Sequence, residues 1–366
     1  MATRESGAGG LEGVVVADTR LSEVDGERGR LVVAGHDVER LAGRVTFEEV
    51  VALLLDGALP GPARREGIQA GLASGRKLGF ETLPRAGDAL QAPDAMDGLR
   101  TAASHLRVEG DGETAALQII GALGTLGAAW SRGKQDLAPV PPDPALSHAA
   151  DVLRMLHGEP RDWARVAGLD AYLVTVADHG MNASTFTARV IASTRSDLVS
   201  TIVGAIGALK GPLHGGAPGP VLDMLDAIGS PDRATAWLEA ELAAGRRVMG
   251  MGHRIYRVRD PRAAVLERAL GALETAGVST GRLALARAVE RAAEGVLRSR
   301  HPDRPLHANV EFYTAVLLDA LGLPRTLFSA TFAMARAAGW CAHVFEQRAV
   351  NRLIRPSSRY VGPVAA

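Results

Sequence analysis

The sequence is short of the residues that mark several classes of protein. Its one cysteine, Cys341, excludes an intrachain disulfide, and a chain without disulfides suits a reducing, cytoplasmic location. Aromatic residues make up only 4% of the chain, so the core must consist mostly of alanine, leucine and valine, which favours helices over sheets. Lysine plus arginine and aspartate plus glutamate balance at 41 each, which gives no electrostatic reason to expect a nucleic-acid or membrane partner.

Further absences concern membrane segments, repeats and metal ligands. No stretch reaches the ~18 apolar residues of a membrane span, and Met1–Gly10 has no hydrophobic signal region. No internal repeat is present, and no pair of side chains has the spacing of zinc ligands. What the chain does have is length and apolar content, with 366 residues of which 47% are hydrophobic. This is enough for one large domain and one smaller domain.

The secondary-structure pattern is almost entirely helical. The only clear β signal is a pair of short predicted strands, Glu12–Ala17 and Arg30–Val33, joined by the turn-rich Asp25–Gly29. Thr46 and Glu49 then form a capping-box pattern in front of an apolar run. Helical spacing of apolar residues predicts further helices over Ala102–Leu106, Ala115–Trp130, Ala145–Leu156, Leu169–Val176, Thr185–Leu209, Ala234–Ala244, Ala263–Ala276, Leu283–Leu297, Phe312–Leu321 and Leu327–Arg348. The sequence therefore predicts a mainly α protein.

Three loop segments far apart in the chain each carry one proton-transfer side chain beside glycine or asparagine, namely His214, His253 and Glu311. Together these groups can make and trap an enolate. A carboxylate removes a C–H proton next to a carbonyl, one histidine supports the enol, and the other protonates a second carbonyl. Each segment also has a structural interpretation: Lys210–Pro220 as a helix stop, Met249–Pro261 as a solvated arginine-rich turn, and Glu311 as a carboxylate favoured by a helix dipole.

Two further polar residues are candidates for binding an anionic substrate. His179 lies at a break between two predicted helices, where Asn182 or Ser184 is expected as an N-cap. Arg336 lies in an otherwise apolar helix, and a buried arginine is costly unless it is paired. Its partner is either a carboxylate of the protein or a dicarboxylate substrate.

Taken together, these segments resemble the citrate synthase family, in its shorter bacterial and archaeal form, from about Gly10 to Pro363. Further collinear motifs that carry the resemblance are Gly10–Val15, Asp25–Glu27, Met96–Thr101, Asp178–His179, Asn182–Ala192 and Arg352–Pro356. The resemblance implies a mainly α, two-domain helical fold with a small N-terminal β-hairpin, assembled as a homodimer. The large domain would comprise residues 1–218 and 325–366, and the small, mobile domain residues 219–324.

The resemblance also implies a reaction and its participants. The family condenses acetyl-CoA with oxaloacetate and water to give citrate and free CoA, and it uses the CoA thioester as a substrate without a cofactor or metal. By this resemblance His214 hydrogen-bonds the thioester oxygen as the enol forms, His253 binds and protonates the oxaloacetate carbonyl, and Glu311 removes the methyl proton. The oxaloacetate and citrate ligands would be His179, Arg262, Arg336 and, across the dimer, Arg355. The CoA-binding loop would comprise Met249, Gly250, Met251, Gly252 and Arg257.

Three positions depart from the family pattern. Glu311 stands in place of the usual aspartate and is about one methylene longer, and a misplacement of ~1 Å can cost ~100-fold in rate. Val176 stands where many members have histidine, and Gly180 where many have glutamate. Two alternatives therefore remain open. One is 2-methylcitrate synthase, which uses propionyl-CoA, since one methylene is worth only about 1–3 kcal/mol of discrimination. The other is a catalytically weak relative that binds a dicarboxylate or CoA.

Overall fold

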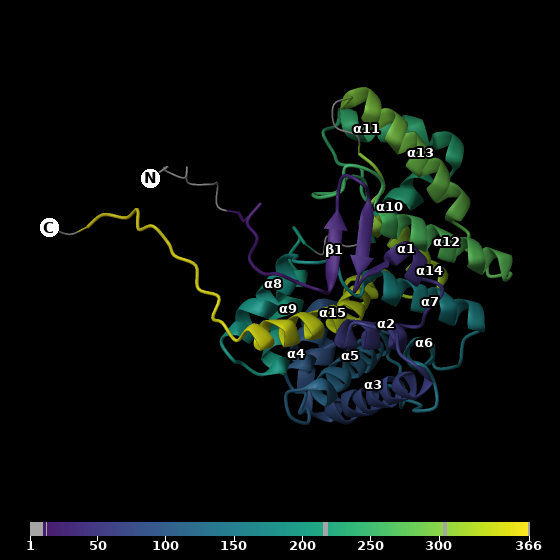
Figure 1. Cartoon of the computed structure of the whole chain (residues 1–366). Coiled ribbons are helices and arrows are strands. Elements are labelled where there is room, and N and C mark those ends of the chain that lie inside the picture. Colours follow the sequence, from purple (N-terminus) through teal and green to yellow (C-terminus); the bar gives the residue numbers. More distant parts are fainter. Residues whose placement is uncertain (1–9, 12, 215–218, 303–305, 365–366) are drawn as a thin grey trace.

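The computed structural model describes residues 10–364 except residue 12 and residues 215–218 and 303–305, and it is almost entirely helical (Figure 1). The α-helices are α1 Val38–Leu41, α2 Phe47–Asp56, α3 Pro62–Thr82, α4 Ala95–Ala103, α5 Glu113–Gly133, α6 His148–His157, α7 Trp163–Val176, α8 Ala183–Ser193, α9 Leu198–Leu209, α10 Gly219–Ile228, α11 Ala234–Ala243, α12 Pro261–Thr275, α13 Leu283–Arg300, α14 Val310–Ala320 and α15 Phe328–Val350. Short 3-10 turns are η1 Leu83–Arg85, η2 Gly87–Gln91, η3 Pro231–Arg233 and η4 Arg325–Leu327. The predicted mainly α fold class is confirmed.

The sheet is an antiparallel meander of three short strands near the N-terminus. β1 (Ser22–Asp25) pairs with β2 (Arg30–Val33), and β2 pairs with β3 (His36–Asp37). The predicted second strand is confirmed, but the predicted first strand Glu12–Ala17 is wrong, because its described residues form no regular structure. The apolar run suggested a strand, yet Val15 is 84% exposed, whereas the polar segment before the tight turn is the one that can pair with β2.

The lower half of the molecule in Figure 1 is built around α5, which is buried over almost its whole length. Its main neighbour is α3, which sequence periodicity missed because glycines rather than large apolar residues form the contact. A Cβ atom at Gly121 of α5 would lie 2.2 Å from the carbonyl oxygen of Leu72 in α3. By length and composition α5 is apolar enough to cross a membrane, contrary to the sequence expectation. However, 94% of its apolar window is buried inside the molecule, as in the core helix of a soluble protein.

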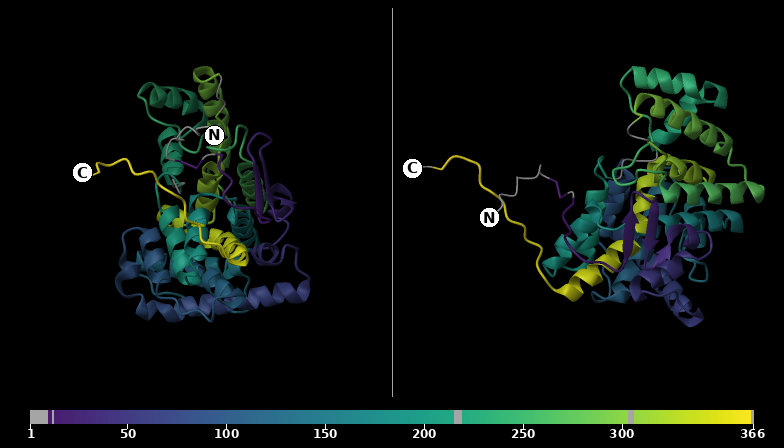
Figure 2. Two further views of the ribbon diagram at one scale, coloured as in Figure 1. Left: turned by 60° about the vertical axis from the view of Figure 1, so that its left-hand side comes forward. Right: turned by 45° about the horizontal axis from the view of Figure 1, so that its top comes forward.

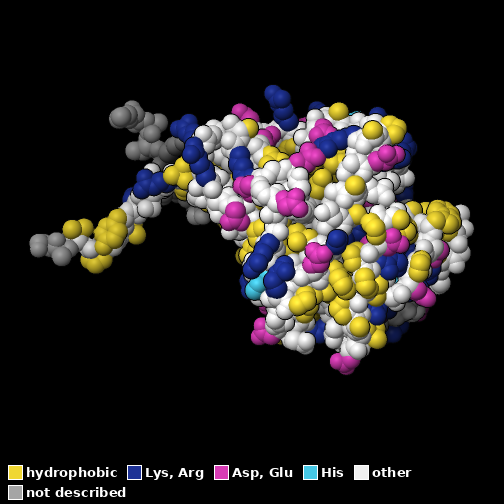
Figure 3. Space-filling view, turned by 90° about the horizontal axis from the view of Figure 1, so that it is seen from below, with side chains coloured by type: hydrophobic (Ala, Val, Ile, Leu, Met, Phe, Trp, Pro, Cys, Tyr) yellow, Lys and Arg dark blue, Asp and Glu magenta, His cyan; other side chains and the backbone are white. Residues whose placement is uncertain are grey.

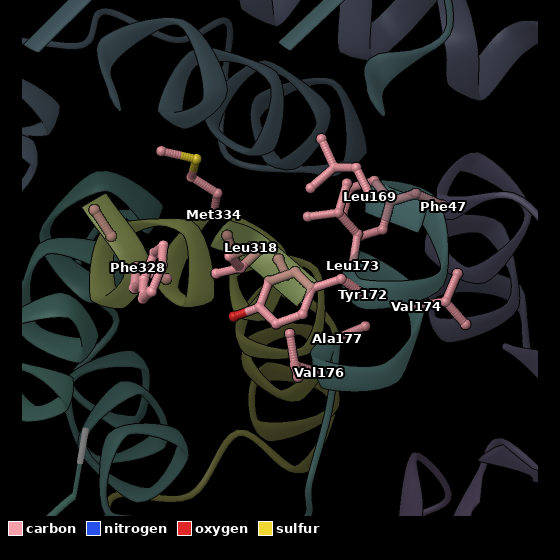
Figure 4. Packing of buried hydrophobic residues seen from close by; sticks show 14 of the residues in the cluster. Phe47, Leu169, Tyr172, Leu173, Val174, Val176, Ala177, Leu318, Phe328 and Met334 are labelled. Carbon is pink, nitrogen blue, oxygen red and sulfur yellow. The ribbon is translucent and has the colours of Figure 1, made fainter. Parts of the chain in front are cut away.

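Helices α7, α14 and α15 form the part of the core that carries the candidate site. Figure 4 shows Tyr172 of α7 extending toward Leu318 of α14, with Phe328 of α15 beyond it, and Leu169 of α7 beside Phe47. These side chains are nearly or completely excluded from solvent. Arg336 in the middle of α15 donates to the carbonyl of Val176 at the C-terminal end of α7, and it lines the same cavity as Glu311 at the N-terminal end of α14. The loops at these ends are therefore held by rigid elements.

One predicted helix, Thr185–Leu209, is two helices in the structure. The chain breaks after α8, where Arg195 adopts a left-handed φ of 66°, and Asp197 then caps α9 by accepting from the backbone N–H of Ser200. The apolar periodicity continues across the break because both helices pack on the same core. An aspartate before an apolar run is an N-cap signal that marks this second start.

The remaining helices extend to the end of the molecule opposite α3, where α11 and α13 lie (Figures 1 and 2). They follow α9 and return to α15 through η4, so the segment 219–324 enters and leaves the rest of the chain at two neighbouring connections. Its designation as a small mobile domain stays a prediction. After α15 the chain projects from the body as an extended segment that carries exposed apolar side chains (Figure 3).

Candidate active site

Two neighbouring cavities bring most of the predicted site residues together. The smaller cavity, of about 410 Å³, is lined by His179, His214, His253, Arg262, Glu311 and Arg336. The larger cavity, of about 1260 Å³, is lined by Met249, Gly250, Met251, Gly252 and Arg257. Both cavities also share the three proton-transfer side chains, which therefore lie where the two spaces meet.

His214 follows α9 and is held by the first turn of α8. The backbone N–H of Ser184 donates to Nε2 of His214 over 3.2 Å, and the Ser184 hydroxyl lies 2.8 Å from the same nitrogen. Since Nε2 accepts a hydrogen bond, we assign the proton of the neutral ring to Nδ1. Burial, with a contribution from the charge of Arg336, lowers the pKa of His214 to about 4. The ring is thus a neutral hydrogen-bond donor at neutral pH.

His253 has the opposite tautomer. Its Nδ1 accepts from the backbone N–H groups of Ile255 (3.0 Å) and Tyr256 (3.1 Å), whereas Nη2 of Arg262 lies farther from Nε2, at 3.4 Å. Because the two shorter contacts are at Nδ1, we assign the ring proton to Nε2. Burial and the nearby guanidinium of Arg262 lower the pKa of His253 to about 4. Two neutral imidazoles therefore present one N–H each, from different ring positions.

Glu311 lies in the first turn of α14 and is tied to the loop that carries His253. The N-cap side chain of Asn309 accepts from the backbone N–H of Glu311 (3.0 Å) and donates to the carbonyl of Gly252 (2.8 Å), while its own backbone N–H donates to Gly250 (2.9 Å). The expected helix-dipole position is therefore real, but it also orients the carboxylate into the cavity. Burial raises the pKa of Glu311, and Arg262 partly opposes that rise.

Arg336 is buried, and no carboxylate among the described residues forms an ion pair with it, although the charge of Asp178 acts on it from beyond ion-pair distance. Its side chain is 1% exposed, Nε donates to the carbonyl of Val176 (2.6 Å), and Nη2 has no hydrogen-bond partner among the described residues. The guanidinium carbon lies 4.6 Å from the ring centroid of Phe332, and burial lowers the pKa of Arg336 to about 10. A buried cation that lacks an ion pair and lies next to a cavity favours an anionic ligand.

Arg262 differs, because its charge is already balanced. It is 3% exposed and forms a two-pronged ion pair with Asp260, with distances of 3.0 and 2.7 Å. Asp260 also caps α12 and accepts from the backbone N–H of Val310 at the start of α14 (3.2 Å). This aspartate was not identified from the sequence, although an aspartate directly before Pro261 is a recognisable N-cap signal.

His179 lies in the loop between α7 and α8, as the sequence indicated. Its Nε2 is 3.1 Å from the hydroxyl of Tyr256, and its ring makes an edge contact with His253 at a centroid distance of 5.7 Å. Asn182, rather than Ser184, is the N-cap of α8. Burial and the charges of Arg262 and Arg336 hold the pKa of His179 well below its usual value.

The larger cavity has a strongly basic wall. Gly250 and Gly252 adopt left-handed φ values of 73° and 83°, so the Met249–Gly252 loop follows a path that side chains resist. Sequence reasoning named only Arg257 as a charged contributor. The other basic residues lining the cavity are Arg246, Arg247, Arg254, Arg300 and His301. The high arginine content of the chain concealed them.

One predicted ligand is absent from both cavities of this chain. Arg355 is exposed in the extended segment after α15 and lines neither cavity. The two other departures from the family pattern also lie outside the lining. Val176 is fully buried in the core, and Gly180, with a φ of 62°, donates its N–H to the hydroxyl of Ser22 over 2.8 Å. Gly215 and Gly216, part of the motif around His214, lie outside the described residues.

Sequence reasoning also missed two polar groups beside the cavity. Thr314 lies one turn after Glu311, lines the smaller cavity and is 1% exposed, and its hydroxyl has no partner among the described residues. Tyr172 of α7 is completely buried, and its hydroxyl is likewise unpartnered within the described chain. Threonine and tyrosine in helices give no sequence signal of this kind. Only the packing shows it.

Comparisons with known proteins agree with this geometry. A family model described as the citrate synthase C-terminal domain matches residues 10–357. The citrate synthase of Acidithiobacillus ferridurans is 38% identical over 97% of this chain and 95% of its own length, and the 2-methylcitrate synthase of Mycobacterium tuberculosis H37Rv is 38% identical over 96% and 90%. The citrate synthase of Thermoplasma acidophilum, solved with carboxymethyl coenzyme A and oxaloacetate, superposes with a TM-score of 0.86 at 27% identity, covering 97% of this chain and 96% of that one.

Proposed function

Because this chain belongs to the citrate synthase family of transferase-type enzymes, we propose that it condenses acetyl-CoA with oxaloacetate and water to give citrate and free CoA. One observation carries most of the weight. The buried guanidinium of Arg336, which forms no ion pair with a described carboxylate, shares a cavity with two neutral imidazoles and the partly buried carboxylate of Glu311. That combination suits a dicarboxylate and an enolisable thioester.

The proton transfers follow from the tautomers. Glu311 removes a proton from the methyl group of the acetyl thioester, and its raised pKa makes it a better base than an exposed carboxylate. The Nδ1–H of His214 donates to the thioester oxygen on which negative charge develops. The Nε2–H of His253 donates to the ketone oxygen of oxaloacetate and delivers the proton as the new C–C bond forms. Water then cleaves the citryl thioester and releases CoA.

The oxaloacetate carboxylates would bind Arg336 and His179, with Arg262 held in place by Asp260. The remaining ligand, Arg355, would come from a second copy of the chain. Exposed apolar side chains flank it, among them Val350 (61%) and Leu353 (55%), and exposed apolar surface of this kind marks interfaces. We therefore include a homodimer in the proposal.

The catalytic set is divided between the two proposed domains. His214, His179 and Arg336 belong to the large domain, whereas His253, Glu311 and the loop Met249–Gly252 belong to residues 219–324. A change in the angle between the domains would therefore assemble or separate the set, and closure would exclude water from the enolate. The basic wall of the larger cavity suits the phosphates of CoA. In this proposal the CoA thioester is a substrate, and no metal or organic cofactor takes part.

A second candidate is 2-methylcitrate synthase, which applies the same chemistry to propionyl-CoA. The Mycobacterium tuberculosis relative with that name is as similar to this chain as the citrate synthase of Acidithiobacillus ferridurans, at 38% identity each. The proposed catalytic groups would serve either acyl chain. The two candidates therefore differ only in which acyl group the cavity prefers.

The deciding experiment compares CoA release from acetyl-CoA and propionyl-CoA with oxaloacetate, using a thiol reagent. Cys341 is fully buried, so its background in the native protein is expected to be small, and a protein-only blank measures it. Higher kcat/KM with acetyl-CoA supports the first candidate, and the reverse supports the second. Thermal stabilisation by oxaloacetate without turnover of either thioester would instead indicate a binding protein that has lost catalysis.

A further inference from the structure

We propose that the N-terminal hairpin, formed by β1, β2 and their turn, is a brace that positions His253, an inference that rests on the proposed function. Its two ends contact the two loops that supply the facing histidines of the smaller cavity. The turn meets the loop that follows His253, and the base meets the loop that carries His179. Both loops lie in other parts of the sequence, so the hairpin links them.

At the turn, the backbone of the hairpin packs directly against the backbone of the neighbouring loop. The N–H of Arg257 donates to the carbonyl of Gly26 over 2.9 Å. A Cβ atom at Gly26 would lie 2.4 Å from the carbonyl oxygen of Ile255, closer than such atoms approach in proteins. Gly26 does not have a left-handed φ, so glycine is required there by this contact rather than by backbone conformation.

The contact acts on His253 through a single peptide group. The carbonyl of Ile255 and the N–H of Tyr256 belong to the same planar unit and move together. That N–H donates to Nδ1 of His253 over 3.1 Å and helps to fix both the tautomer and the orientation of the ring. A displacement of the Ile255 carbonyl by the hairpin therefore moves a donor that holds the candidate acid.

A second glycine strengthens the same contact. Gly29 has a left-handed φ of 61°, and a Cβ atom there would lie 2.5 Å from Cγ2 of Val258. In this case the obstructing atom belongs to a side chain that can be shortened. The hairpin itself is anchored from below, because Leu31 and Val33 of β2 are almost completely buried.

The base of the hairpin contacts the second loop, so that the hairpin and the two loops all contact one another. The hydroxyl of Ser22 donates to the carboxylate of Asp178 and accepts from the N–H of Gly180, on either side of His179. The hydroxyl of Tyr256 in turn meets Nε2 of His179 over 3.1 Å. The hairpin, the His253 loop and the His179 loop thus hold one another, and the hairpin sets the spacing between the two rings.

The test replaces Gly26 with alanine. Because a shift of ~1 Å in a reacting group can cost ~100-fold in rate, we expect Gly26→Ala to lower kcat on that order. The KM for oxaloacetate should change less than kcat, because Arg336, a proposed ligand of its carboxylates, lies outside the brace. The overlap should also lower the melting temperature. Gly35→Ala is the control, since Gly35 lies in the next turn of the same sheet, between β2 and β3, and no atom lies within 4 Å of the added Cβ even though its φ of 86° is left-handed. It should keep kcat within about twofold of the wild type.

A relief experiment covers the case in which Gly26→Ala fails to fold. Gly29→Ala should lower kcat, and the double variant Gly29→Ala/Val258→Ala, which removes the obstructing methyl, should recover part of the loss. Val258→Ala alone should have nearly normal kcat. If Gly29→Ala is equally active with and without Val258→Ala, the added Cβ atom does not act by displacing the loop.

Ring-nitrogen signals of ¹⁵N-histidine separate failure of the brace from failure of the proposed function. The His253 signals, assigned with His253→Gln, should move in Gly26→Ala and stay in place in Gly35→Ala, whether or not the protein turns over acetyl-CoA. If the wild type is inactive but the His253 signals still move in Gly26→Ala, the proposed function is wrong and the brace is supported. An active wild type with unchanged kcat and unchanged ring signals in Gly26→Ala would overturn the brace.

Discussion

Arg76 and Arg336 are both almost completely buried, yet their surroundings differ. Arg76 of α3 is paired with Asp151 over 2.7 Å and also donates to two backbone carbonyls. Arg336 of α15 donates to one carbonyl and is paired with no carboxylate in the described part of the chain. Each guanidinium has one buried nitrogen without a partner among the described residues, so the ion pair is what separates them. Because a buried charge is stable only when it is compensated, the Arg336 arrangement favours an anion from solution.

The difference shows which features identify a site. Burial of a charged group does not do so, since the Arg76 region contains as many buried ionisable groups as the cavity, including Asp151 and His148. An incomplete set of partners beside a cavity is the discriminating feature. By the same criterion Glu311 resembles Arg336, because its carboxylate forms no ion pair within the described residues, whereas Asp151 binds two arginines.

The largest expected effect is a fall in kcat when the carboxylate of the site is removed. Glu311→Ala removes the proposed base, and loss of a general base costs ~10²–10⁴-fold in kcat. Oxaloacetate binding, measured by thermal shift, should persist because Glu311 is not among its proposed ligands. Glu311→Asp is the graded control, and the shorter side chain should cost ~100-fold if the backbone is adapted to glutamate. Full activity of the alanine variant would remove Glu311 from the mechanism.

Exchange of each arginine for methionine tests the comparison directly. Arg76→Met leaves Asp151 buried with part of its compensation lost, and breaking a buried pair costs about 3–5 kcal/mol of unfolding free energy. Arg336→Met removes a buried charge that forms no ion pair with the described residues, so the unfolding free energy should be equal to or above that of the wild type. Chemical denaturation of the two variants measures both effects.

The same pair of variants reports on the ligand. Oxaloacetate at 100 times its Kd should stabilise the wild type by about 2.7 kcal/mol, and this gain should vanish in Arg336→Met. If Arg76→Met folds, it should retain the gain. Similar losses of stability in both variants, with oxaloacetate stabilisation intact in each, would show that Arg336 is an ordinary structural arginine.

An effect on pH dependence is expected at Asp170 of α7, which lines neither cavity. Asp170 accepts from the backbone N–H of Phe47 (2.9 Å), and burial together with the carboxylate of Glu48 raises its pKa to about 7. Its folded pKa lies above the unfolded value of about 3.9. The protonated form therefore contributes stability below pH ~4, and this contribution is lost as the pH rises through about 7.

Asp170→Asn should consequently stabilise the protein at pH 8 by up to about 4 kcal/mol, the free-energy equivalent of the pKa difference. The advantage should shrink as the pH falls from 7 toward 4. Denaturation curves at several pH values measure it, and Asp162→Asn, at an exposed N-cap on the same helix, is the control. A stability difference that does not vary with pH would contradict a titrating Asp170.

The sequence was sufficient to predict those parts of the fold whose structure is set by residues that are neighbours in the chain. The capping box of Thr46 and Glu49 is present as predicted, and apolar periodicity located most helices of the core. It missed α3 because glycines at a close helix contact leave no apolar stripe, and it placed the first strand wrongly because pairing depends on the turn rather than on apolarity. Such features arise from tertiary contact and leave little local pattern.

In the site, too, some features could be predicted from the sequence and others could not. Glycine-rich loops and the start of α14 pointed to His214, His253 and Glu311, and the structure brings them to one cavity, although their roles remain predictions. The groups that set their state could not be read in advance. The tautomer of His214 depends on Ser184, which is 30 residues away in the chain, and that of His253 on a turn that brings the N–H groups of Ile255 and Tyr256 onto its ring. The place of Arg355 depends on a second chain.

The smallest expected effect compares two buried histidines, one from each region. Burial lowers the pKa of both, to about 3 for His148 and about 4 for His214, so low pKa alone does not mark a catalytic ring. What distinguishes His214 is the polar support of Ser184. Ser184→Ala removes the hydroxyl but keeps the backbone donor, and one neutral hydrogen bond is worth about 1 kcal/mol, or roughly fivefold in kcat.

The control is Thr187→Ala, which removes a hydroxyl from the next turn of α8 that bonds only to the carbonyl of Ala183 (2.9 Å). It should leave kcat unchanged. Ser184→Ala also leaves the indole N–H of Trp340 without its acceptor, so a fall in the melting temperature is expected beside the kinetic effect. A fall in stability with normal kcat would mean that Ser184 supports Trp340 and the core, and that the backbone N–H alone holds His214.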